Sequence, residues 1–201
     1  MKNYLFAMML MLSAAAMPMR ATADVIEVPA APPDQGGMEI DDERVAGQLL
    51  ERFRAAQLSL GEAILIAEKL HSGSTTTRIR FDTSDSPRYR VRTAKDDKIW
   101  DNVIDARTGT VQRNEITLSL RDLSAEDRGN IVALKSAKQE LSDAVSIAEK
   151  AAIGKAFGGG LMNEGGKLKF VVVIVSGDRV KEVMLEPPRA GRQGSALRRT
   201  P

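Results

Sequence analysis

The chain contains no cysteine and one histidine among its 201 residues, and only 4% of its residues are aromatic. Without cysteine it can form no disulfide and has no thiol for lipid attachment. The fold must therefore be stabilised by apolar burial, which favours packing of the whole chain over independent units of about 80 residues. His71 has no second imidazole or thiol to help it form a metal site or a nucleophile–base pair.

A long apolar run is also missing. Tyr4 to Ala16 form an apolar stretch of 13 positions, whereas a membrane-spanning helix needs roughly 20. Lys2 precedes this stretch, and Ala21-Thr22-Ala23 fits a small-x-small cleavage site. Residues 1–23 are therefore predicted to be a secretory signal peptide, and a retained membrane anchor is the weaker alternative. We expect a periplasmic or secreted protein with no membrane span after cleavage.

An excess of charge of one sign is missing from the predicted mature chain. Cleavage would remove Lys2 and Arg20, which leaves 29 − 2 = 27 basic residues against 27 acidic ones. The net charge is then near zero, so the composition predicts no nucleic-acid partner.

Motifs that carry reactive groups are missing too. The chain has no Gly-x-Ser-x-Gly and no phosphate loop, and Gly158-Gly159-Gly160 is interpreted as a glycine-rich connection. His71 is interpreted as a helix cap. Four aspartates lack calcium-loop spacing, so a weak cation site is the less favoured interpretation: Asp96, Asp97, Asp101 and Asp105. We expect no enzyme, no catalytic residue, no cofactor and no metal.

What the chain does have is an internal repeat. Residues 141–150 repeat residues 60–69 with six identities, at an offset of 141 − 60 = 81. At the same offset Tyr89 aligns with Phe170 and Val91 with Val172. A fixed period of this kind is typical of a duplicated structural unit.

Each unit shows apolar residues first at helical spacing and then at strand spacing. In the first, helices are predicted over 41–56 and 60–71, followed by strands over 77–81, 88–93, 99–104 and 111–120. Ser59 and Glu62 fit a capping box at the start of the second helix.

The second unit repeats this order of elements. We predict a helix that starts at Ser124, a helix over 141–152, and strands over 167–175 and 180–186; Gly158–Gly160 predict a weak or displaced first strand. The expected fold is α+β, with two tandem repeats that each pack helices on a three- to four-stranded antiparallel sheet. The predicted boundaries are a signal peptide (1–23), a flexible leader (24–39), repeat 1 (40–120), repeat 2 (121–191) and a disordered basic tail (192–201).

These patterns resemble the PepSY domain of metallopeptidase propeptides and exported bacterial proteins. The likeness rests on Ala63, Ile66 and Ala67, on Tyr89-x-Val91, and on Asp105-Ala-Arg-Thr-Gly109. The second unit keeps Phe170-x-Val172 but lacks the closing Asp-Ala-x-Thr-Gly. The resemblance implies a small α+β unit that binds or restrains peptidases and has no catalytic residues of its own.

Two features of the predicted strands could form an interaction surface. Alternation places five arginines on one sheet face if the strands at 77–81 and 88–93 pair: Arg78, Arg80, Arg88, Arg90 and Arg92. Carboxylates such as Asp101 could neutralise them, or they could bind an acidic partner. The stretch 170–175 has no polar face, and Val171, Val173 and Val175 are either covered within the chain or part of an interface.

The leading hypothesis is a binding protein that contacts a peptidase or other envelope protein through a sheet face. A homodimer through the second repeat is possible on the same grounds. The alternative is a sensor or carrier for a small anion or envelope polymer that uses the arginine face alone.

Overall fold

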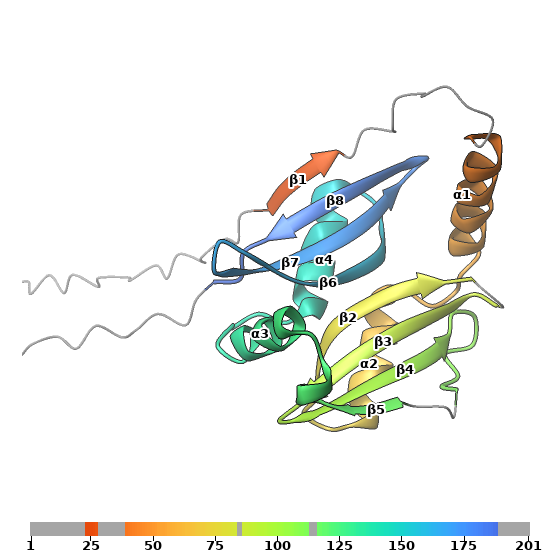
Figure 1. Ribbon diagram of the computed structural model, residues 1–201. Coiled ribbons are helices and arrows are strands. Elements are labelled where there is room, and N and C mark those ends of the chain that lie inside the picture. The colour runs from red at the N-terminus through yellow and green to blue at the C-terminus, as the bar shows by residue number, and fades with distance from the viewer. Residues whose placement is uncertain (1–22, 28–38, 84–85, 113–115, 189–201) are drawn as a thin grey trace, which may run out of the picture.

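The computed structural model has an α+β fold, and within its described residues four α-helices accompany one antiparallel sheet (Figure 1). It describes residues 23–27, 39–83, 86–112 and 116–188. The helices are α1 (Glu39–Arg54), α2 (Leu60–Leu70), α3 (Ala125–Leu134) and α4 (Leu141–Ala152). The strands are β1 (Ala23–Glu27), β2 (Thr75–Asp82), β3 (Arg88–Lys95), β4 (Lys98–Asp105), β5 (Ile116–Ser119), β6 (Lys155–Glu164), β7 (Lys167–Ser176) and β8 (Arg179–Leu185). The described strands form a single sheet in the order β1-β8-β7-β6-β2-β3-β4-β5.

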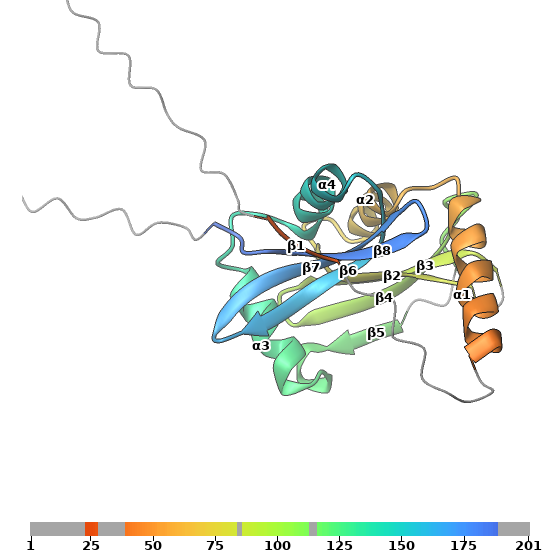
Figure 2. The same cartoon turned by 90° about the horizontal axis from the view of Figure 1, so that it is seen from above.

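Helices α2 and α4 lie side by side on one face of the sheet, and α3 lies on the opposite side (Figure 2). The predicted capping box is present in α2, since the Ser59 side chain accepts from the Glu62 N–H and Glu62 accepts from the Ser59 N–H. The predicted buried face is also confirmed: Leu60, Ala63, Ile64 and Ala67 are all buried. Below these helices, the largest fully buried side chains are Tyr89 and Phe170, the two aromatics that align at the offset of 81.

The centre of the sheet is the antiparallel pair β2–β6, which joins the two halves of the chain. Arg78 pairs with Gly160, Ile79 with Gly159, and Arg80 with Gly158. The predicted weak first strand is therefore wrong, because β6 runs through all three glycines. A Cβ added at Gly158 would lie 3.2 Å from the Ile79 carbonyl oxygen, so β2 approaches a backbone that has no side chain in the way.

The repeated Ile-Ala-Glu-Lys sequence has a local structural explanation. The Thr76 N–H donates to the Glu68 carboxylate at 2.8 Å, and the Ala156 N–H donates to the Glu149 carboxylate at 2.9 Å. Each glutamate thus accepts a hydrogen bond from the backbone at the start of the strand that follows its helix. Burial raises the pKa of Glu68, so this carboxylate is desolvated to make the contact.

Glu68→Gln is expected to keep the acceptor and remove the desolvated charge. The folded-state pKa of Glu68 lies above its unfolded value, so its ionisation lowers the free energy of unfolding as pH rises through and above pH 4.5. The gain of Glu68→Gln over the wild type should therefore be larger at pH 7 than at pH 4 in urea titrations. Glu68→Ala should instead lose about 1–3 kcal/mol, because the Thr76 N–H is left unsatisfied. The same stability for both variants at both pH values would contradict this role.

The N-terminal predictions are corrected in one respect. Asp24–Glu27, expected within the flexible leader, belong to β1, which pairs with β8 from Ala23↔Leu185 to Glu27↔Lys181. The pairing satisfies the N–H and C=O groups on the outer side of β8, which would otherwise form an open edge. The segments predicted as signal peptide (up to residue 22), as the rest of the flexible leader (28–38) and as the basic tail (192–201) lie outside the described residues. Among the helices that the structure describes, none is long and apolar enough to cross a bilayer.

Helix α1 is anchored at its C-terminal end. The Phe53 ring packs edge-on against Phe81 and Phe157 with centroids 5.2 Å away in each case. Arg54 donates to the Asp178 carboxylate at 2.7 Å and to the Gly177 carbonyl at 2.8 Å, in the β7–β8 turn. The last turn of α1 therefore bridges the two halves of the sheet.

Candidate functional site: an arginine and valine sheet face

The candidate site lies on the sheet face opposite α2 and α4. The register defines two rows of residues across the strands of this face. One row runs Glu182, Val173, Gly158, Arg80, Arg90, Val103, and the next runs Met184, Val171, Gly160, Arg78, Arg92, Asp101. We call this surface the Arg–Val face, after Arg78, Arg80, Arg90, Arg92, Val171 and Val173. Residues almost 100 positions apart are thus brought onto one surface.

The Arg78–Arg92 pair is neutralised within the chain. These arginines are directly opposite each other on β2 and β3, an unfavourable arrangement for like charges. Asp127, in the first turn of α3, lies 2.8 Å from Arg78 and 3.8 Å from Arg92. Asp101 accepts two hydrogen bonds from Arg92, both at 2.7 Å, and this contact raises the pKa of Arg92. The prediction that Asp101 could neutralise this face is confirmed for Arg92.

The Arg80–Arg90 pair is less completely neutralised. Arg90 donates to Asp82 at 2.6 Å, and its side chain remains 42% exposed. Arg80 is exposed and has no carboxylate partner within the part of the chain that the structure describes. Arg88 contacts Asp82 at 3.4 Å and is itself buried, so the expectation of five exposed arginines is wrong for Arg88. Arg88 lies directly opposite Asp82 in the β2–β3 pair, so their ion pair links the two strands.

The predicted valine surface is only partly open. Val171 and Val173 are half-buried on the Arg–Val face, whereas Val175 is buried and joins the main core. The intervening Val172 and Ile174 are buried on the side of α4. Gly158 and Gly160 separate the valines from the arginines, so the middle of the face has no side chains. Sequence reasoning missed this glycine strip, because Gly158–Gly160 were interpreted as a connection.

The Asp105-Ala-Arg-Thr-Gly109 motif forms a turn. Asp105 accepts hydrogen bonds from the N–H groups of Arg107 and Thr108, and these bonds lower its pKa. Ala106 is fully buried and its carbonyl accepts from Gln57 and Leu58. Gly109 has φ +72, a conformation that favours glycine. The motif therefore fixes the end of β4 against the loop that precedes α2.

The remaining candidates have structural roles. His71 is the C-cap of α2, as predicted, and its ring stacks on Trp100 with centroids 4.0 Å apart. No group of three acidic or imidazole side chains suited to a metal lies within the described residues.

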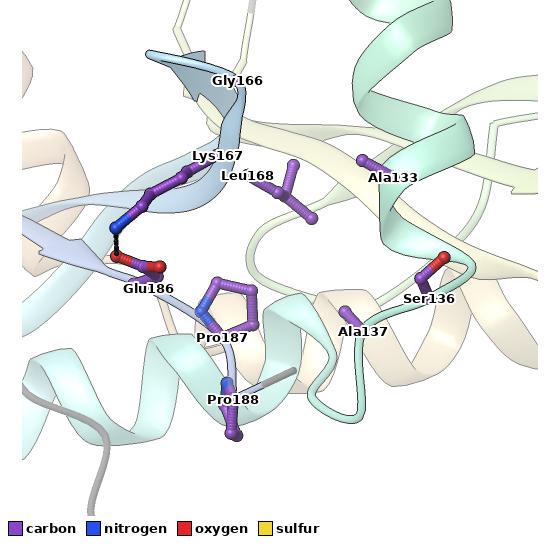
Figure 3. A pocket seen from close by; sticks show the side chains of 9 residues that line it. All are labelled: Ala133, Ser136, Ala137, Gly166, Lys167, Leu168, Glu186, Pro187 and Pro188. Atoms are coloured by element: carbon purple, nitrogen blue, oxygen red, sulfur yellow. Dashed lines mark hydrogen bonds and ion pairs between the residues drawn. The ribbon is translucent and has the colours of Figure 1, made fainter. Parts of the chain in front are cut away.

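A cavity of about 350 Å³ lies at the β6–β7 turn (Figure 3). The Lys167–Glu186 ion pair, at 3.3 Å, lines one side of it. It contains none of the predicted site residues; its lining consists of Ala133, Ser136, Ala137, Gly166, Lys167, Leu168, Glu186, Pro187 and Pro188.

Comparison with known proteins finds a PepSY domain, described as "Peptidase propeptide and YPEB domain", at residues 57–115. No catalytic family is indicated. No curated protein sequence is significantly similar to the chain. A solved structure of a candidate lipoprotein from Clostridium difficile 630 is similar over 68% of this chain and 90% of its own, with 16% identity and a TM-score of 0.38. The matched residues span α2 to the end of β4 and the turn at Asp105, so the family's motif coincides with the first half of the sheet.

Proposed function

We propose that the chain is an exported, non-catalytic binding protein that holds a peptidase or another envelope protein against its Arg–Val face. The PepSY domain at residues 57–115 fits a peptidase-related binding role. The observation that carries the proposal is the continuity of the face. The exposed Arg78 and Arg80, the partly exposed Arg90 and Arg92, and two half-buried valines lie in the same two rows, on either side of the glycine strip. Binding surfaces combine apolar burial with charged groups that fix orientation in the same way.

We also propose that residues 40–120 and 121–191 are two copies of one PepSY-like unit. At an offset of 81, α2 aligns with α4, β2 with β6, β3 with β7 and β4 with β8, each within two residues. The Glu68 and Glu149 contacts support the same correspondence. Export to the periplasm or outside the cell, with residues 1–23 as the cleaved leader, completes the proposal.

The small-anion alternative is weaker on this geometry. Arg78, Arg90 and Arg92 already donate to aspartates of the same chain, so a small anion would have to compete with them for all but Arg80. That alternative would require binding that is lost on charge reversal at Arg80 and Arg90 but does not change with Val173.

Site-specific photo-crosslinking tests the proposed function. A benzophenone amino acid at position 173 should crosslink an envelope protein in intact cells, and the same group at Leu65, 52% exposed on α2, should not. The added charge reversal Arg90→Glu should reduce the product at position 173 by about tenfold, the effect of removing one favourable charged contact. A product of twice the monomer mass would instead identify a homodimer. Equal products at both positions, or none at position 173, would contradict binding through this face.

A further inference from the structure

The Arg–Val face carries two successive arginine pairs in different states. Arg78–Arg92 and Arg80–Arg90 are both directly opposed pairs between β2 and β3, and they are about 7 Å apart along the strands. The first pair is bridged by Asp127 from a helix that lies on this face. The second has a carboxylate beside Arg90 but none on Arg80 within the described chain. The face thus has one arginine pair that a carboxylate bridges and a second arginine pair that no carboxylate of the described chain bridges.

Helix α3 shows what occupies such a position. Ser124 caps it by accepting from the Asp127 N–H at 3.0 Å, which holds the Asp127 carboxylate in the first turn. One turn later, Ile131 is buried in a small apolar cluster with Ala94 and Ile99. Helix α3 therefore packs on this face through a carboxylate in its first turn and a branched apolar side chain four residues further on. The helix dipole favours the carboxylate at that end.

The surroundings of the open pair match the same chemistry. Gly158 lies next to Arg80 across the β2–β6 pair, and Val173 follows on β7. Gly158 is buried among its neighbours but carries no side chain, so a side chain that lies over it would reach the half-buried Val173. The cationic and apolar groups are thus two strands apart, or about 10 Å. This separation is within reach of one helix, whose diameter with side chains is about 10–12 Å.

We propose that the Arg80–Arg90 pair is the docking point for an acidic amphipathic helix of the client protein. Its carboxylate bridges Arg80 and Arg90 as Asp127 bridges Arg78 and Arg92, and its apolar side chain packs over Gly158 on Val173. This inference rests on the proposed function, because it names the part of the client that the Arg–Val face holds. A partner with a basic or uncharged helix does not fit, since it would leave Arg80 without a counter-charge.

The chain supplies its own probe for this chemistry. A synthetic peptide of residues 124–135, which carries Asp127 and, one helical turn later, the apolar Ile131, is titrated into the ¹⁵N-labelled protein of residues 24–201. Amide shifts are expected at Gly158 and Val173, together with shifts of the Arg80 and Arg90 Nε–H signals. Asp127→Asn in the peptide and Arg80→Gln in the protein should each weaken binding by about tenfold or more, because a charge-assisted hydrogen bond is lost. Arg121→Gln, which removes one positive charge from the 3-10 turn at residues 120–122, is the matched control and should have no effect.

Each other outcome overturns the inference. Absence of shifts with a peptide that circular dichroism shows to be helical under the titration conditions would show that the pair does not take such a helix. Binding that is indifferent to both substitutions would show that the carboxylate does not matter. Shifts confined to Arg78 and Arg92 would show that the peptide only displaces α3. Crosslinking at position 173 that survives Arg80→Gln would leave the proposed function in place while removing this mode of docking. Failure of crosslinking in the wild-type protein would remove both.

Discussion

Gly154→Ala is expected to destabilise the protein by more than about 3 kcal/mol, among the larger effects of a single substitution. Gly154 lies between α4 and β6, where the backbone passes directly beside β7. An added Cβ would lie 2.4 Å from the Val175 carbonyl oxygen and 2.6 Å from the Ile174 Cγ2. Neither atom is the end of a flexible side chain, so the helix or the strand would have to move. The midpoint of urea unfolding measures the loss.

The same substitution at Gly129 is the matched control. Gly129 lies in α3, and an added Cβ there would meet nothing within 4 Å. Gly129→Ala should therefore raise the free energy of unfolding by about 0.5–1 kcal/mol, the usual advantage of alanine in a helix. An unchanged unfolding midpoint for Gly154→Ala would show that the α4–β6 junction is not as tightly packed as described.

Residues 39–120, expressed alone, are not expected to form a stable monomer, although they include the whole PepSY match. Removal of the second half would expose the β2 backbone that pairs with Gly158–Gly160 and the side of α2 that contacts α4. It would also remove Phe157, against which Phe53 packs. A unit of about 80 residues without disulfides has little stability to spare, and an open edge of this kind promotes association.

Circular dichroism melting and gel filtration test this expectation. The chain of residues 24–201 should melt cooperatively, whereas the fragment should lack a sharp transition or elute as an oligomer. A monomeric fragment that melts within a few degrees of the longer chain would contradict the idea that the β2–β6 pair is required for stability.

The sequence predicted the local elements well, because their signals are local. The spacing of Leu60, Ala63, Ile64 and Ala67 identified the buried side of α2, and the Ser59–Glu62 capping box fixed its start. Alternation predicted the two strands and placed their arginines on one face on the condition that the strands pair, which β2 and β3 do. The α+β class follows from these patterns.

The long-range features could not be predicted in the same way. The antiparallel β2–β6 pair depends on contacts between residues about 80 positions apart, and the glycines that allow it have no periodicity to detect. Asp127 could not be assigned to Arg78, because the sequence of a surface helix does not show which distant residue each of its side chains contacts. The predicted leader differed at β1 because pairing with β8 is decided by the free edge of that strand.

The two halves of the sheet also differ in the chemistry of the side chains that they place on the Arg–Val face. The β2–β6 pair joins two unlike halves of the sheet. On the Arg–Val face, the arginines therefore lie on β2 and β3 and the valines on β7, with Gly158 and Gly160 of β6 between them. A sheet face with two identical halves would accept a client in either of two orientations. This one distinguishes them, so a bound client would be held with a defined end toward β4 and its opposite end toward β8.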